Sequence, residues 1–119
     1  MIDPSSRIAE ILNTTARNGG TITYREIADI AEIPSPGRIQ AVTGALENRI
    51  RADHATGRPL LAAVAVSRGG DGLPGAGFFQ LCREIGLYFG PDHGPQAEMF
   101  HALELRRLRA TLSEPPPTP

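Results

Sequence analysis

The chain has few of the residues that cross-link a protein or bind metal. It contains one cysteine, Cys82, and neither tryptophan nor lysine among its 119 residues. A single cysteine excludes an internal disulfide and any zinc site built from cysteine pairs. The three histidines, His54, His93 and His101, are too far apart in sequence to form a ligand pair on one helix. We therefore expect neither a metal nor a cofactor.

Long apolar runs are also missing. None approaches the ~20 residues that a membrane-spanning helix requires, and the first residues lack the charged and apolar segments of an export signal. These features predict a cytoplasmic protein of bacterial type. The length and the 40% hydrophobic content fit one domain, expected over residues 1–112. Residues 113–119 contain four prolines and are expected to be a disordered tail.

Charge is nearly balanced over the whole chain but not along it. Twelve arginines and thirteen acids give a formal net charge of −1, which argues against strong, indiscriminate binding to nucleic acid. Between residues 37 and 70, however, five arginines face only two acids. One part of the domain is thus expected to present a positive face. GC-rich coding bias is the alternative explanation for arginine without lysine.

The first half of the chain has the pattern of three helices. Apolar residues three and four positions apart predict a first helix that ends near Asn18, and a very short edge strand at residues 21–23 follows. Thr23 and Glu26 have the spacing of a capping box at the start of a second helix. The third helix is predicted to begin near Arg38 and to end between residues 53 and 57. The predicted buried positions of the second and third helices are Ile27, Ile30, Ala31, Ile39, Val42, Leu46 and Ile50.

The second half begins with a predicted strand. Residues 60–66 are apolar and partly β-branched, which is typical of a buried strand, and a glycine-rich loop follows at residues 69–77. A short helix is expected from Phe78 until Gly86 ends it, and residues 87–89 should pack as an extended piece. The last helix is predicted at residues 96–112. Its predicted apolar stripe consists of Phe100, Leu103, Leu105, Leu108 and Leu112.

This order of elements predicts an α+β fold that is mainly α. Helix, very short strand, helix, tight turn, longer helix, strand and glycine-rich loop is the order of a winged helix-turn-helix, here with a short sheet and a C-terminal helix. In such domains the third helix commonly lies against DNA. Fold alone does not establish function.

Two sequence segments resemble a known family. The first is Ile22-Thr23-Tyr24-Arg25-Glu26-Ile27-Ala28-Asp29-Ile30-Ala31 and the second is Gln40-Ala41-Val42-Thr43-Gly44-Ala45-Leu46. Together they resemble the DNA-binding domain of alkylguanine-DNA alkyltransferases and of the related alkyltransferase-like proteins. The resemblance covers residues 21–77.

The resemblance implies a winged helix that enters the minor groove. It assigns to Tyr24 the tyrosine that helps to rotate a nucleotide out of the duplex. The arginine that fills the gap falls on Gln40 in an ungapped alignment, and Arg38 is two residues earlier. The Pro-Cys-His-Arg motif of the family should fall near residues 61–64, which read Leu-Ala-Ala-Val. Because the nucleophile and its activating base are both missing, alkyl transfer by that mechanism is excluded and no catalytic residue is assigned.

The residues themselves predict a DNA-binding surface on the third helix. If its apolar positions face inward, its outer arc mixes amide and guanidinium groups with small residues. Gly44 suggests a close approach, either of DNA backbone or of a neighbouring helix, because glycine inside a helix costs about 1 kcal/mol relative to alanine. We expect binding of duplex DNA through this helix and the glycine-rich wing, without enzymatic activity. The expected DNA-binding residues are Tyr24, Arg38, Gln40, Thr43, Gly44, Asn48, Arg51 and Arg68.

Bland alternatives exist for each of these signals. Tyr24 is also consistent with a core aromatic that has a tethered hydroxyl, and the arginines with a solvated face. The apolar stripe of the last helix would make the protein a protein-protein interaction module with no role on nucleic acid if the stripe were exposed. A weaker alternative is a small enzyme, because residues 70–75 match Gly-x-Gly-x-x-Gly and Asp92-His93 could act as an acid/base pair.

Overall fold

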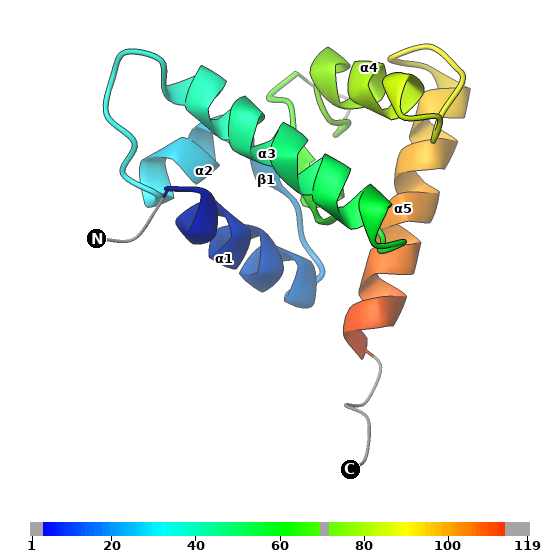
Figure 1. The fold of residues 1–119 in the computed structure, drawn as a ribbon, viewed down its shortest axis with the longest axis horizontal. Helices are drawn as coiled ribbons and strands as arrows, with labels where there is room; N and C mark the ends of the chain where they lie inside the picture. The colour runs from blue at the N-terminus through cyan, green and yellow to red at the C-terminus, as the bar shows by residue number, and fades with distance from the viewer. Residues whose placement is uncertain (1–3, 70–71, 114–119) are drawn as a thin grey trace.

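The computed structural model describes residues 4–69 and 72–113. Its elements, in chain order, are α1 (Pro4–Arg17), β1 (Ile22–Thr23), α2 (Tyr24–Ile30), α3 (Arg38–Ala55), a 3₁₀ helix η1 (Leu61–Val64), β2 (Ala65–Val66), α4 (Ala76–Glu84) and α5 (Pro95–Ser113) (Figure 1). β1 and β2 form a two-stranded parallel sheet that pairs Ile22 with Ala65 and Thr23 with Val66. The expected fold class, α+β and mainly α, is confirmed.

The start of α2 follows directly from the sequence. The Thr23 hydroxyl accepts a hydrogen bond from the Glu26 backbone N–H at 3.1 Å, and the Glu26 carboxylate accepts one from the Thr23 backbone N–H at 3.1 Å. These two bonds complete the predicted capping box and satisfy N–H groups that have no partner within the helix. After α2, residues 31–37 turn the chain, and Gly37 precedes α3 with φ of 83°, a conformation that glycine adopts readily.

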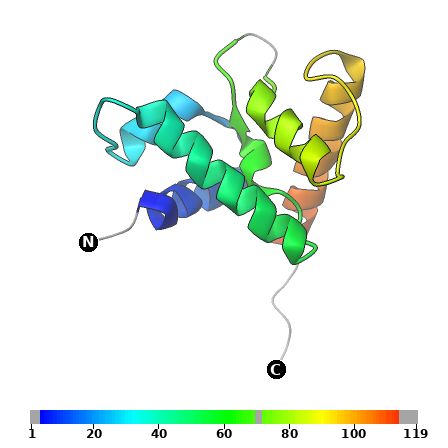
Figure 2. The ribbon, with the colours of Figure 1, turned by 45° about the horizontal axis from the view of Figure 1, so that its top comes forward.

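The helices are arranged around η1. α3 crosses the molecule, with α1 on one side and α4 on the other, while α5 runs along one edge (Figures 1 and 2). η1 contacts α1, α3 and α5, so this 3₁₀ helix lies where the two halves of the chain meet. One hydrophobic cluster includes side chains from all five α-helices.

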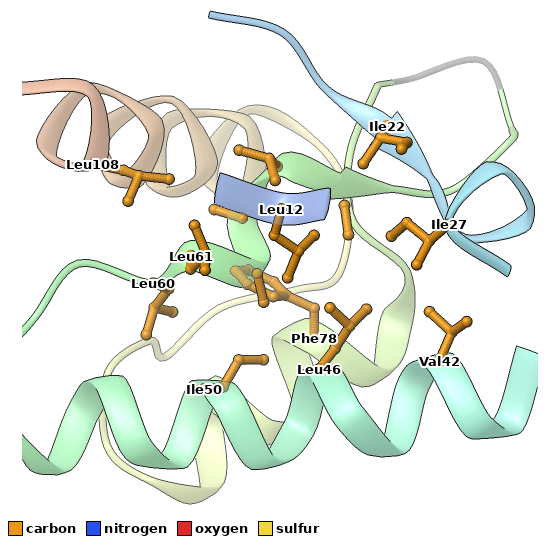
Figure 3. Close-up of a cluster of buried hydrophobic side chains, with 14 of the residues drawn as sticks. Leu12, Ile22, Ile27, Val42, Leu46, Ile50, Leu60, Leu61, Phe78 and Leu108 are labelled. Atoms are coloured by element: carbon orange, nitrogen blue, oxygen red, sulfur yellow. The ribbon is translucent and has the colours of Figure 1, made fainter. Parts of the chain in front are cut away.

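The inner face of α3 contributes three aliphatic side chains to this core. Val42, Leu46 and Ile50 are buried and point from one side of α3 towards Phe78 and Leu12 (Figure 3). Their spacing of four residues keeps them on one stripe of the helix. Because this stripe faces the core, the opposite side of α3 is turned towards solvent.

The prediction of a strand at residues 60–66 is wrong for most of its length. All seven residues are buried, as expected, but residues 61–64 form η1, and only Ala65 and Val66 form a strand. β1 is only two residues long and offers too little edge to pair with a longer strand. The preceding backbone is satisfied by side chains instead of by a neighbouring strand.

Two isoleucines predicted to be buried are on the surface. Ile30 is 48% exposed and Ile39 is 46% exposed. α2 has only seven residues, and Ile27 and Ala28 supply its buried contacts. Ile39 lies in the first turn of α3, where the helix extends past the core.

The buried stripe of α5 differs from the predicted one. Ala97, His101, Glu104 and Leu108 are buried, Leu103 is 52% exposed, and Phe100, Leu105 and Leu112 are half-buried. Two polar side chains thus occupy core positions that an apolar pattern cannot reveal. α5 also includes Ser113, which was assigned to the tail, and residues 114–119 lie outside the described residues.

The β-hairpin of a wing is not seen in the described part of the chain. β2 pairs with β1, and the next described element is α4. The Ser67 backbone N–H donates to the Leu73 carbonyl at 2.8 Å, which closes the loop after β2. In residues 4–69 and 72–113, no helix has the length and apolar content needed to cross a bilayer.

Candidate nucleic-acid interface

The solvent-facing side of α3 brings together most of the residues expected to bind DNA. We call Gln40, Thr43, Gly44, Glu47, Asn48 and Arg51 the open face of α3. Thr43 is half-buried and the other five are exposed. The open face lies opposite the buried stripe of Val42, Leu46 and Ile50, and Figure 2 shows α3 running across the front of the molecule. The sequence therefore predicted this face correctly as a surface.

Gly44 lies at the centre of the open face with free space around it. A Cβ atom built at this position has no neighbouring atom within 4 Å. Packing against another helix of this chain, one of the two explanations for this glycine, is therefore wrong. The explanation that remains is an approach from outside the protein.

Tyr24 is held inward at the start of α2. Its hydroxyl accepts a hydrogen bond from the Gly75 backbone N–H at 2.6 Å, and a Cβ atom at Gly75 would lie 3.3 Å from the phenol ring. Burial raises the pKa of the Tyr24 hydroxyl, so the phenol is neutral at physiological pH. In this structure Tyr24 links α2 to the segment before α4, and its hydroxyl does not project towards a displaced nucleotide.

A small apolar cavity separates Tyr24 from the open face. It has a volume of about 70 Å³ and is lined by Tyr24, Thr43, Leu46, Ala62, Gly75 and Phe78, among others. The exposed residues Glu47 and Gly77 contribute to its lining. The space is large enough for a small apolar group beside α3.

Arg38 is engaged in the turn between α2 and α3. Its Nε donates to the Ile33 carbonyl at 2.8 Å, and its guanidinium forms an ion pair with Asp29. The hydrogen bond from Arg38 lowers the pKa of the Asp29 carboxyl. A phosphate at this position would have to share the guanidinium with Asp29.

The other two arginines of the proposed site are more accessible. Arg51 is exposed and lies 3.7 Å from the Glu84 carboxylate, a long and solvent-exposed ion pair. Arg68 is exposed two residues after β2. Exposed ion pairs contribute only about 0–1 kcal/mol, so a phosphate can replace Glu84 at little cost. The open face also carries Glu47, and its positive potential is therefore modest.

The amides on the open face differ in their surroundings. Gln40 and Asn48 are both exposed. Asn48 borders a shallow groove of about 280 Å³ between α1 and α3, together with Ser5, Ser6, Ala45 and Ala52. The Thr43 hydroxyl donates to the Gln40 carbonyl at 3.1 Å within the helix. Gln40 and Asn48 are thus the side chains best placed to reach base edges.

Three buried polar side chains hold η1, and the sequence analysis did not single them out. Asp53 accepts from the Leu61 backbone N–H at 3.1 Å, and Glu104 accepts from the Leu60 N–H at 3.1 Å. His101 Nε2 lies 2.7 Å from the Ala63 carbonyl and donates to it, because a carbonyl can only accept. A sequence signal existed: Asp53 extends the stripe of Leu46 and Ile50, and residues 97, 101, 104 and 108 have helical three-four spacing.

The remaining candidates for chemistry are engaged elsewhere or lie outside the described residues. Burial, together with the negative charge of Glu104, raises the pKa of the Cys82 thiol to about 12, so its thiolate is scarce near neutral pH. Asp92 pairs with Arg83 at 2.6 Å. Gly70 and Asp71, which begin the Gly-x-Gly-x-x-Gly match, lie outside the described residues. Within residues 4–69 and 72–113, no group of three or more histidine, cysteine or acidic side chains is arranged to hold a metal ion.

Comparison with known proteins leaves this geometry as the main guide to function. No protein-family model, no curated protein and no solved structure matches the chain.

Proposed function

We propose that this protein binds duplex DNA without transforming it chemically, in the manner of a winged helix-turn-helix domain. The open face of α3 and the loop after β2 form the proposed contact surface. Arg38, Arg51 and Arg68 hold phosphates, while Gln40 and Asn48 reach base edges. Having one cysteine, the chain needs no oxidising compartment, which fits a cytoplasmic role on DNA.

One observation carries this proposal. Gly44 is a helix-interior glycine on an exposed face, and nothing in the described structure approaches it. Glycine weakens a helix, so its presence at an unobstructed position is explained by a partner that comes closer than a side chain would permit. The flanking amides, threonine and arginine are groups that pair with phosphates and base edges.

The affinity should depend on salt in a way that counts the contacts. Three phosphate contacts predict that the logarithm of the binding constant falls with the logarithm of salt concentration with a slope of about −2.7. Fluorescence anisotropy of a labelled duplex between about 50 and 200 mM salt measures this slope. The double variant Arg51→Ala, Arg68→Ala should reduce the slope to about −0.9, because only the contact of Arg38 remains.

A charge-matched variant separates specific contacts from net charge. Arg7→Ala with Arg17→Ala removes the same two charges from exposed positions on α1. This control should keep the slope of the unmodified protein. A flat salt response, or equal weakening in both double variants, would contradict the proposed interface.

A further inference from the structure

α5 has an exposed face opposite its buried one. Met99 is 67% exposed and Leu103 is 52% exposed, although both are large apolar side chains. They are four residues apart and therefore lie on one side of the helix, away from the buried line of residues 97, 101, 104 and 108. The exposed residues Ala102, Arg106 and Ala110 continue this side. We call Met99, Ala102, Leu103, Arg106 and Ala110 the outer face of α5.

Exposed apolar surface is concentrated around this helix. Five large hydrophobic side chains of the described residues are exposed, and Met99, Leu103 and Phe89 belong to α5 or to the segment that leads into it. Figures 1 and 2 both show α5 at an edge of the molecule, with the rest of the fold on its inner side. An apolar helix face at an edge is typical of a protein-protein contact.

The charges beside the outer face fit a second copy of the same helix. Glu98 lies in the first turn of α5, and Arg106 follows eight residues later, about 12 Å along the axis. In an antiparallel pair centred on Ala102, Glu98 of each copy lies opposite Arg106 of the other, so the pairing occurs twice. A parallel pair would place like charges together.

The middle of the outer face also suits an antiparallel pair. Ala102 is exposed and small, which lets two helix axes approach closely at the centre of symmetry. Met99 and Leu103 flank this point and would pack across it. An interface in which each residue meets its symmetry-related counterpart in this way is the kind formed about a two-fold axis.

We propose that the outer face of α5 binds the same face of a second copy of this protein, with the two helices antiparallel. One helix face buries less than the roughly 800 Å² per partner of a standard stable interface. The dimer is therefore weak and depends on protein concentration. This proposal is independent of DNA binding, because α5 contributes no residue to the open face of α3.

Sedimentation equilibrium from about 1 μM to about 1 mM protein tests the association. We expect a monomer-dimer equilibrium for the unmodified chain and at least a tenfold weaker one for Leu103→Glu. Ile30→Glu is the matched control, because Ile30 on α2 is 48% exposed against 52% for Leu103. Its dissociation constant should equal that of the unmodified protein. A monomer throughout the range, or equal weakening by Ile30→Glu, would overturn the proposal.

Charge reversal tests the antiparallel arrangement. Glu98→Arg and Arg106→Glu should each weaken the dimer, because each variant places like charges opposite one another. The variant that carries both changes should regain the affinity of the unmodified protein. A double variant weaker than either single variant would overturn the antiparallel pairing. Circular dichroism of every variant verifies that helix content is unchanged.

Discussion

Gly44 is the residue at which stability and proposed function conflict. In the middle of α3 a glycine lowers helix stability by about 1 kcal/mol relative to alanine. The model has free space where its Cβ would be, so the fold itself gains nothing from the missing methyl group. A glycine retained at such a position points to a requirement outside the folded chain.

Gly44→Ala should therefore have opposite effects on stability and on binding. We expect the free energy of unfolding to rise by about 0.5–1 kcal/mol, because alanine is the better helix former and its methyl group contacts nothing. We expect duplex affinity to fall several-fold, because the methyl group occupies the space that DNA backbone would use. Urea unfolding and fluorescence anisotropy measure the two quantities.

Ala110→Gly on α5 is the control for this pair of effects. Ala110 is exposed within a helix and lies outside the proposed DNA contact, so the substitution should lower stability and leave affinity unchanged. If Gly44→Ala stabilised the protein at constant affinity, the glycine would have no role in binding.

At the scale of elements, local signals predicted most of the helices. The capping box of Thr23 and Glu26 fixed the start of α2, and the spacing of Val42, Leu46 and Ile50 fixed the buried side of α3. The opposite side of α3 was therefore predictable as well. That is why the structure brings Gln40, Thr43, Gly44, Asn48 and Arg51 onto one surface.

Elements that depend on distant partners could not be predicted in this way. Residues 60–66 have strand-like composition, yet β1 pairs with only two of them, and η1 is fixed by side chains 8, 38 and 44 residues away in sequence. Tyr24 likewise bonds to Gly75, 51 residues later. Periodicity reports which face of a helix is apolar, but it does not report which backbone groups a buried acid satisfies.

Asp53 is the test of how η1 is held. Its carboxylate is 3% exposed and accepts hydrogen bonds from the Leu61 backbone N–H and from Arg49. Asp53→Ala leaves the Leu61 N–H buried without an acceptor, so we expect the free energy of unfolding to fall by about 2–3 kcal/mol in urea titrations. Asp53→Asn keeps an acceptor and should lose less. Glu47→Ala, an exposed acid on the same helix, should change stability by less than about 0.5 kcal/mol.

At the scale of the whole molecule, the two ends of the described chain meet at η1. α1 and α5 both contact η1 and also contact each other. His101 supplies one of the links, since its ring donates to the Ala63 carbonyl from α5. A change in the charge of His101 therefore acts on the centre of the fold and on global stability.

Acidification should destabilise the protein through His101. Burial lowers the pKa of this histidine below 6.5, and the positive charge of Arg109 lowers it further, against a raising effect of the bond to Ala63. Between its folded pKa and 6.5 the unfolded chain binds more protons than the folded one, so the free energy of unfolding falls as pH falls through this window, by at most about 1.4 kcal/mol per pH unit. Urea unfolding between about pH 7.5 and about pH 5.5 measures the slope above the range where most carboxylates titrate. His101→Gln keeps an N–H donor for Ala63 and cannot titrate, so its stability should lose this pH dependence, and an unchanged slope in that variant would assign the effect to another group.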